Sequence, residues 1–273
     1  MTEKKVALIT GASSGIGESA AILLHNEGFK VYGAARRVEK MKELESKGIS
    51  TIALDITEED SIVSCVNTIT EQEGSIDILV NNAGYGSYGA IEDVSMKEAR
   101  RQFDVNIFGL ARLTQLVLPG MREKRFGKIV NISSMGGKIY TPFGGWYHAT
   151  KHALEGWSDC LRLEVKEFGI DVVLVEPGGI KTPWGIIAAE NLKKTSGEGA
   201  YAKAAIKSAE GTAKMYNSNR LTHPDVIGKV ILKAVTTSKP RRRYVKGMGA
   251  KPSLFIRKWF GDGAWERMVK AMM

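Results

Sequence analysis

Tyr147 and Lys151 lie four positions apart, a spacing that places a phenol and an ammonium on one face of a helix. Both groups could then act on the same reacting atom. A phenol with a pKa near 10 relays protons poorly at pH 7, and lowering that pKa by about three units requires roughly 4 kcal/mol of preferential stabilisation of the phenolate. The charge of the lysine has the required sign. Such pairs are also common on helix surfaces, so the pair needs support from the rest of the sequence.

A glycine-rich segment, Thr10-Gly-Ala-Ser-Ser-Gly-Ile-Gly17, follows one apolar run and precedes an apolar helical pattern. Its first glycine lets the chain turn, its second lets the backbone approach a pyrophosphate, and its third lets helix and strand pack closely. Free N–H groups and the helix dipole then face the anion. The alternative is a plain glycine-rich turn. We expect a dinucleotide phosphate site formed by Gly11, Ser13, Ser14, Gly15, Ile16 and Gly17.

The end of the next apolar run reads Ala34-Ala-Arg-Arg37, with no acidic residue to bind the 2'-hydroxyl of an NAD ribose. A 2'-phosphate carries close to two negative charges, and a guanidinium binds such a group in a fork. Arg36 and Arg37 therefore predict NADP as the cofactor, with Arg36 the more important contact. The alternative is that both arginines are solvated or pair with Glu39.

Polar residues lie at the ends of two further strand candidates, where doubly wound folds bind their ligands. With these residues the sequence resembles the classical short-chain dehydrogenase/reductase family, over roughly residues 5–185. The motifs that carry the resemblance are Thr10 to Gly17, Asn81-Asn-Ala-Gly84, Asn106, Ser134, Tyr147-x-x-x-Lys151 and Pro177-Gly178.

The resemblance implies a set of residues for proton transfer. Tyr147 would be the acid/base, and Lys151 would modulate its pKa and bind the ribose. Ser134 would polarise the substrate oxygen, and Asn106 would anchor a water of the proton relay. Ser134 is preferred to Ser133 because the family's serine commonly lies thirteen residues before its tyrosine. An oxidised nicotinamide ring would add positive charge beside the phenol.

Further cofactor contacts follow from the same resemblance. Asp55, with Ile56 beside it, would contact the adenine, although Asp55 could instead cap the helix that follows. The contacts expected on the ribose side and around the nicotinamide are Asn81, Ala83, Gly84, Pro177, Gly178, Ile180 and Thr182.

The implied reaction interconverts a carbonyl compound and its alcohol. Several segments look most like the hydroxysteroid and retinol dehydrogenase branch, among them Asn-Ala-Gly-Tyr-Gly and Glu-Pro-Gly-Gly-Ile-Lys-Thr. A site lined by apolar side chains gains roughly 25 cal/mol per Å² of apolar ligand surface, which predicts a lipophilic ketone, aldehyde or alcohol as substrate. The candidate pocket residues are Tyr85, Met135, Phe143, Trp146, Trp184, Ile186 and Ile187, of which Phe143 and Trp146 could instead belong to the core or to a subunit interface.

Short β-branched runs alternate with longer helical patterns, and the runs are apolar throughout, as in a parallel sheet covered on both faces. We therefore predict a single-domain α/β fold, a Rossmann-type doubly wound parallel sheet of about seven strands with helices on both faces. Expected strands span 6–10, 31–34, 51–54, 76–81, 128–132, 171–175 and 243–246. Expected helices span 16–28, 38–47, 58–73, 97–124, 147–168 and 226–235, the last capped by Thr222 with Pro224 in its first turn.

Two segments lie outside this pattern. Residues 178–217 contain no clear strand and are expected to form a mobile substrate lid with short helices. Residues 239–273 carry ten Lys/Arg and two acids, which is nearly all of the net charge of +9. Their aromatics, Phe255, Trp259, Phe260 and Trp265, could contact an anionic membrane surface or bind nucleic acid, but we favour docking within the protein or to another subunit.

Composition excludes several classes. The 273 residues are 43% hydrophobic and 25% charged, with no run long enough to span a membrane and no secretory signal. The two cysteines form no zinc or disulfide pattern, which fits a cytoplasmic protein. We expect no metal, no nucleic acid and no integral membrane segment, a peripheral membrane contact at most, and a homodimer or homotetramer.

Three other interpretations compete with this one. His148 and His152 could be two metal ligands, but position 149 is alanine, so surface histidines are preferred. A serine hydrolase is disfavoured because Ser134 lacks the Gly-x-Ser-x-Gly elbow. An NADP-binding interaction protein without catalysis is the third, and the intact proton-relay set speaks against it.

Overall fold

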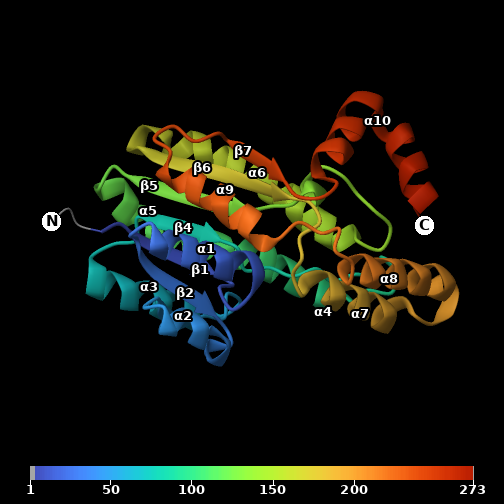
Figure 1. Cartoon of the computed structure of the whole chain (residues 1–273), viewed down its shortest axis with the longest axis horizontal. Coiled ribbons are helices and arrows are strands. Elements are labelled where there is room, and N and C mark those ends of the chain that lie inside the picture. The colour runs from blue at the N-terminus through green and yellow to red at the C-terminus, as the bar shows by residue number, and fades with distance from the viewer. Residues whose placement is uncertain (1–3, 273) are drawn as a thin grey trace.

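The computed structural model describes residues 4–272, and its centre is a sheet of seven parallel strands in the order β3-β2-β1-β4-β5-β6-β7 (Figure 1). Every strand position predicted from the sequence is confirmed, with ends that differ by one or two residues. Between β1 and β4 the strand order reverses, and such a switch point opens a crevice at the carboxyl ends of the strands. The strands are β1 (Val6–Thr10), β2 (Lys30–Ala35), β3 (Ser50–Ala53), β4 (Ile78–Asn81), β5 (Gly127–Ile132), β6 (Ile170–Pro177) and β7 (Arg243–Lys246).

Helices cover both faces of the sheet, which confirms the doubly wound fold. One apolar cluster joins one side of the strands to α3 (Glu59–Glu73), α5 (Gly109–Glu123) and α6 (Gly145–Val165). The second cluster joins the other side to α1 (Gly15–Asn26), α2 (Lys42–Ser46) and α9 (Pro224–Thr236). The apolar strands are thus covered by a layer of helices on each face of the sheet.

The helix expected over 97–124 is broken. It consists of α4 (Met96–Phe103), a π-helical turn (Asp104–Phe108) and α5. At the junction the backbone of Gly109 lies against Ile56, and a Cβ at position 109 would come within 2.0 Å of the Ile56 carbonyl oxygen. Such turns place an extra residue per helical turn and often lie at functional sites. This turn holds Asn106.

Two other helical predictions need correction. Residues 38–47 form a 3-10 turn (Val38–Met41) followed by the short α2. The N-cap of α9 is His223 and not Thr222, because the His223 side chain accepts a hydrogen bond from the backbone N–H of Asp225. Pro224 opens the helix as expected.

The segment expected as a lid forms two helices of moderate length, α7 (Trp184–Ser196) and α8 (Ala202–Tyr216), joined by a 3-10 turn (Gly199–Tyr201). They pack against each other as a hairpin beyond the carboxyl ends of the strands (Figure 1). Small and apolar side chains form the contact, namely Ala189, Leu192, Ala205 and Ala209.

The chain ends in α10 (Ala250–Met272), which contains a kink at Gly261 with φ of 72°. Beyond the kink, Trp265 is buried and donates a hydrogen bond to the Tyr140 carbonyl, so this half docks on the protein. Before the kink, Phe255, Trp259 and Phe260 are exposed. Among residues 4–272, no helix has the length and apolar character needed to cross a membrane.

The close approach at Gly109 generates a stability prediction. Gly109→Ala should lower the free energy of unfolding by about 2–3 kcal/mol, because its Cβ meets backbone that cannot easily move. Gly156→Ala is the matched control, since nothing lies within 4 Å of a Cβ there, and it should stabilise α6 by about 0.5–1 kcal/mol. Denaturant titration measures both, and equal effects would contradict the argument.

Candidate active site

A cleft of about 1420 Å³ lies where the strands end. It brings together most of the residues that the sequence assigned to the cofactor and the reaction. The predicted residues that line it are Gly11, Ser13, Ser14, Gly15, Ile16, Arg36, Arg37, Asp55, Ile56, Ala83, Gly84, Tyr85, Ser134, Tyr147, Lys151, Pro177, Gly178, Ile180, Thr182, Trp184 and Ile187.

The glycine-rich turn forms one wall of the cleft. Gly11 and Gly15 have φ of 67° and 63°, a region that favours glycine. Ser14, the N-cap residue of α1, makes no capping hydrogen bond through its side chain, which leaves N–H groups of the first turn available to an anion. Gly17 does not line the cleft; a Cβ there would lie 2.4 Å from the Gly11 carbonyl oxygen, which makes it the packing glycine of the turn.

Basic side chains gather at the far end of the cleft. Arg36 and Arg37 follow β2 and are exposed, and Lys40 and Arg101 line the same region. Lys40 and Arg101 were missed from the sequence, although Lys40 follows Arg37 by one 3-10 turn, which is a local signal. Four basic side chains in the cleft that holds the phosphate cradle are compatible with a dinucleotide that carries an additional phosphate group.

Asp55 lines the cleft, and its adenine contact stays a prediction; it does not cap α3, whose N-cap is Glu58, but it holds the turn before that helix. Its Oδ1 accepts hydrogen bonds from the Thr57 N–H (3.0 Å) and the Thr57 hydroxyl (2.8 Å). Partial burial opposes ionisation, but these hydrogen bonds and the nearby guanidinium of Arg36 hold the pKa of Asp55 below its usual value. The carboxylate therefore stays an acceptor at neutral pH.

Tyr147, Lys151 and Ser134 meet in the middle of the cleft. Lys151 Nζ donates a hydrogen bond to the Ile132 carbonyl oxygen at the end of β5 (2.8 Å). Ser134 Oγ accepts one from the Gly136 N–H (3.0 Å), which leaves the hydroxyl hydrogen free to donate. The ring of Tyr147 packs beside Trp184 of α7, with the ring centroids 5.1 Å apart. A substrate carbonyl between Ser134 and Tyr147 would be held under the first helix of the hairpin.

Burial works against ionisation of both reacting groups. It raises the pKa of Tyr147 to about 12, and the Ser134 hydroxyl only partly offsets this. Burial also lowers the pKa of Lys151 to about 8, with the carboxylate of Glu155 acting in the opposite direction. Phenolate formation at neutral pH therefore depends on positive charge brought close to Tyr147.

Asn106 is buried behind the cleft and does not line it. Its Oδ1 accepts a hydrogen bond from the Tyr85 N–H, and its Nδ2 donates to the Tyr85 carbonyl (3.0 Å) and the Thr150 hydroxyl (3.1 Å). The π-helical turn thus fastens α6 to the segment that follows β4. Asn106 thus holds the position of α6, and its role in anchoring a water molecule stays a prediction.

One predicted contact, Asn81, faces away from the cleft, whereas its neighbour Asn82 lines it. Asn81 is buried and donates to the Thr114 hydroxyl (3.2 Å) and to Asn131 Oδ1 (2.9 Å), so it ties β4 to β5 and α5. Because side chains alternate along a strand, its neighbour Asn82 faces the glycine-rich turn instead and donates to the Thr10 carbonyl (2.9 Å).

Four of the seven expected substrate residues lie outside the main cleft. Trp146 lines a separate pocket of about 390 Å³ with Phe103 and Phe108, because it points about 100° away from Tyr147 on the helix. Met135, Phe143 and Ile186 are not among the residues that line the main cleft. Tyr216 of α8 and the α7 residues Asn191, Lys194 and Thr195 line it and were missed, since only the hairpin brings them there.

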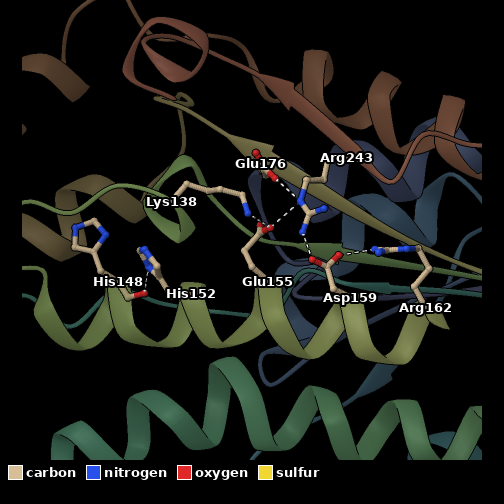
Figure 2. Close-up of polar contacts among 8 residues, drawn as sticks. All are labelled: Lys138, His148, His152, Glu155, Asp159, Arg162, Glu176 and Arg243. Atoms are coloured by element: carbon tan, nitrogen blue, oxygen red, sulfur yellow. Dashed lines mark hydrogen bonds and ion pairs between the residues drawn. The ribbon is translucent and has the colours of Figure 1, made fainter. Parts of the chain in front are cut away.

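The expectation that His148 and His152 are surface histidines is wrong for His148 (Figure 2). His148 is buried, with Nδ1 2.9 Å from the Gly136 carbonyl oxygen and Nε2 3.0 Å from the Thr141 hydroxyl. It fastens the turn after Ser134 to α6. Within residues 4–272, no group of three or more His, Cys, Asp or Glu side chains could hold a metal ion.

Comparison with known proteins gives a family match. Residues 5–193 match the family described as "short chain dehydrogenase". An uncharacterized oxidoreductase YusZ of Bacillus subtilis is 37% identical, over 98% of both chains. A 3-ketodihydrosphingosine reductase of Bacteroides thetaiotaomicron is 38% identical, over 87% of this chain and 86% of the relative.

Solved structures agree. A short-chain dehydrogenase from Streptomyces avermitilis superposes with a TM-score of 0.81 at 32% identity, over 98% of both chains. An actinorhodin polyketide ketoreductase with NADPH gives 0.74 at 28% identity, over 90% of this chain and 96% of that one. A 3-ketoacyl-(acyl-carrier-protein) reductase from Brucella melitensis complexed with NADH gives 0.75 at 26% identity, over 92% and 99%.

Proposed function

This chain belongs to the short-chain dehydrogenase family of oxidoreductases, and from that premise we propose that it interconverts a lipophilic ketone or aldehyde and its alcohol with NADP(H). One observation carries the proposal. A phosphate cradle, an end with four basic side chains and the set Ser134, Tyr147 and Lys151 line a single cleft.

The residues of the cleft fit a nicotinamide dinucleotide. A Cβ at Gly11 would lie only 2.9 Å from Asn82 Nδ2, so the turn requires glycine at this position. The first turn of α1 offers backbone N–H donors to a pyrophosphate. Arg36, Arg37 and Lys40 would hold a 2'-phosphate. When bound, NADP(H) supplies or accepts a hydride at C4 of its nicotinamide ring.

The chain's own groups handle the proton. Ser134 Oγ donates a hydrogen bond to the substrate oxygen and fixes its position. Tyr147 Oη gives a proton to that oxygen during reduction and takes it back during oxidation. The ammonium of Lys151 stabilises the phenolate that forms, since burial alone raises the pKa of Tyr147 to about 12. Trp184 and the hairpin exclude water from this exchange.

Tyr147→Phe tests the acid/base role. It should lower kcat by at least about a hundredfold and leave NADPH affinity nearly unchanged, because the ring stays and only the proton relay is lost. Tyr32→Phe is the control, since the Tyr32 hydroxyl bonds Gln72 and Glu73 outside the cleft. A panel of carbonyls with NADPH and of alcohols with NADP measures turnover. Near-native turnover in Tyr147→Phe would refute the role, and no turnover in the unmodified chain would favour a binding protein without catalysis.

Cofactor choice rests on the basic end of the cleft. Arg36→Ala with Arg37→Ala should weaken NADPH binding by roughly tenfold or more, because charge-assisted bonds to the 2'-phosphate are lost. NADH affinity should change far less, since NADH lacks this group. Arg122→Ala, at the opposite end of the sheet, should alter neither. Fluorescence titration with both cofactors measures the difference, and equal losses for NADPH and NADH would overturn the assignment.

The substrate class rests on the side chains around Tyr147. Trp184, Ile187 and the rings of Tyr85 and Tyr216 contribute apolar surface to the cleft, which Asn191, Lys194 and Thr195 also line. The relative from Bacteroides thetaiotaomicron is named for 3-ketodihydrosphingosine. We therefore place lipophilic ketones first, and steroid- or retinoid-type alcohols remain a narrower option within this class.

A graded series of aliphatic ketones tests the class. The value of kcat/KM should rise with each added methylene, by up to about fourfold per group at 0.8 kcal/mol of burial. Trp184→Ala should flatten the rise, whereas Trp146→Ala, in the separate pocket, should preserve it. A flat or falling series in the unmodified chain would remove the lipophilic substrate and leave the hydride chemistry untouched.

Other features of the proposal concern assembly and location. Exposed Met96 and Phe108 flank the pocket of Trp146, an apolar face that supports a homodimer or homotetramer. The aromatic cluster before the kink of α10, with Lys258 against Trp259, supports peripheral contact with an anionic membrane as an alternative. Cys65 and Cys160 are free thiols, in keeping with the cytoplasm.

A further inference from the structure

A cluster of charged side chains lies one helical turn beyond Lys151 on α6, in a region that the hydride chemistry does not use (Figure 2). Its centre is Glu155, which is only 4% exposed. Glu155 Oε2 accepts a hydrogen bond from Arg243 Nε at 3.0 Å and lies 3.0 Å from Lys138 Nζ. Burying a carboxylate costs free energy unless it is paired, and Glu155 is paired with two cations.

A second carboxylate, Glu176 of β6, faces the same guanidinium. It is 1% exposed, and its Oε1 lies 3.1 Å from Arg243 Nε. Arg243 also binds Asp159, which is paired in turn with Arg162. Arg243 is therefore the shared partner of three carboxylates. Within the described residues, Oε1 of Glu155 and Oε1 of Glu176 have no hydrogen-bond partner.

Glu155 and Glu176 cannot both ionise freely so close together. Burial first, and then the charge of Glu155, raise the pKa of Glu176 to about 7, against the opposing charges of Lys138 and Arg243. Two interacting carboxyl groups of this kind release their protons as a pair. Near neutral pH the pair therefore holds between one and two negative charges in a buried site.

Two observations connect this pair to the reacting groups. The charge of Glu155 opposes the burial that lowers the pKa of Lys151. In addition, the turn after β5 packs tightly on this part of α6: a Cβ at Gly137 would lie 2.9 Å from the Lys151 carbonyl oxygen and 3.0 Å from Glu155 Cγ. Lys151 and Glu155 are thus held in one rigid turn, with no room for a side chain between them and the sheet.

We propose that Glu155 and Glu176 act together as positioning residues that keep Lys151 protonated, and so set the upper pH limit of the reaction. The inference rests on the proposed roles of Tyr147 and Lys151. Lys138, after the 3-10 turn that follows β5, and Arg243 of β7 contact the pair directly. On α6, the charge of Glu155 acts on Lys151, Asp159 and Arg162 continue the network through Arg243, and His152 lies one turn before Glu155 (Figure 2).

The sign of the effect follows from the charges. Glu155→Gln removes a negative charge that favours the ammonium, so the pKa of Lys151 should fall below about 8. An additional drop of about one unit is expected for a charge one helical turn away in a partly shielded site. Because Lys151 loses its proton well before Tyr147, the alkaline limb of kcat/KM for carbonyl reduction should move down by the same amount.

Two measurements on the full chain test the proposal. A ¹³Cε-lysine NMR titration, with Lys151 assigned by its absence in Lys151→Arg, reports its protonation without any substrate. The pH profile of kcat/KM, with the most active ketone of the panel and NADPH, reports the consequence for turnover. Glu155→Gln and Glu176→Gln are compared with Glu164→Gln, a matched control on the exposed face of the same helix.

Glu155→Gln should lower the Lys151 pKa by about one unit, Glu176→Gln by about half a unit, and Glu164→Gln by less than about 0.2. Glu155→Asp keeps the negative charge, so the Lys151 pKa should stay close to its value in the unmodified chain. If Glu155→Gln does not fold, Glu176→Gln decides, since the neutral form of Glu176 is already well populated at pH 7. A merely structural pair would lower Tm and kcat without moving either pH curve, and that result would overturn the proposal. If the panel shows no turnover, the NMR titration still separates this inference from the proposed function.

Discussion

The placement of one buried ammonium, Lys151, constrains the whole catalytic region. Burial removes the hydration of Nζ. The hydrogen bond to the Ile132 carbonyl at the end of β5 and the charge of Glu155 compensate for this loss. A hydrogen bond to a strand end is possible only if α6 lies tightly against that end. Gly137 permits this approach, and His148 and Asn106 fix the helix from two other sides. The cleft is therefore shaped around α6, the helix that carries Tyr147 and Lys151.

Local patterns predicted the parts of the site whose geometry depends on neighbours in the chain. The i, i+4 spacing of Tyr147 and Lys151 needs only a helix, and the glycine turn needs only a strand before it and a helix after it. The five inner strands were likewise evident, because strands buried on both faces are largely apolar, whereas the edge strands β3 and β7 are partly exposed. In each case, local sequence and tertiary structure favour the same conformation.

Other features depend on contacts that no local pattern contains. The break at Asp104–Phe108 follows from the approach of Ile56 to Gly109, two residues more than fifty positions apart. Asn81 and Asn82 are identical in type, and only the register of β4 decides which faces the glycine turn. Trp146 lies beside Tyr147 in sequence but in another pocket, whereas Tyr216 reaches the cleft only through the packing of α7 on α8. The positions of these residues could not be predicted from the sequence around them.

The electrostatics of the site follow from the same tight packing. Excluding water from Tyr147 strengthens every interaction with the substrate oxygen, yet it also raises the energy of the phenolate and of the ammonium that must support it. A single lysine cannot offset its own burial, so negative charge has to lie behind it. Glu155 provides that charge, and Arg243 and Lys138 in turn make its burial tolerable. The charges thus alternate in sign from Lys151 in the cleft, through Glu155 of α6, to Arg243 of β7.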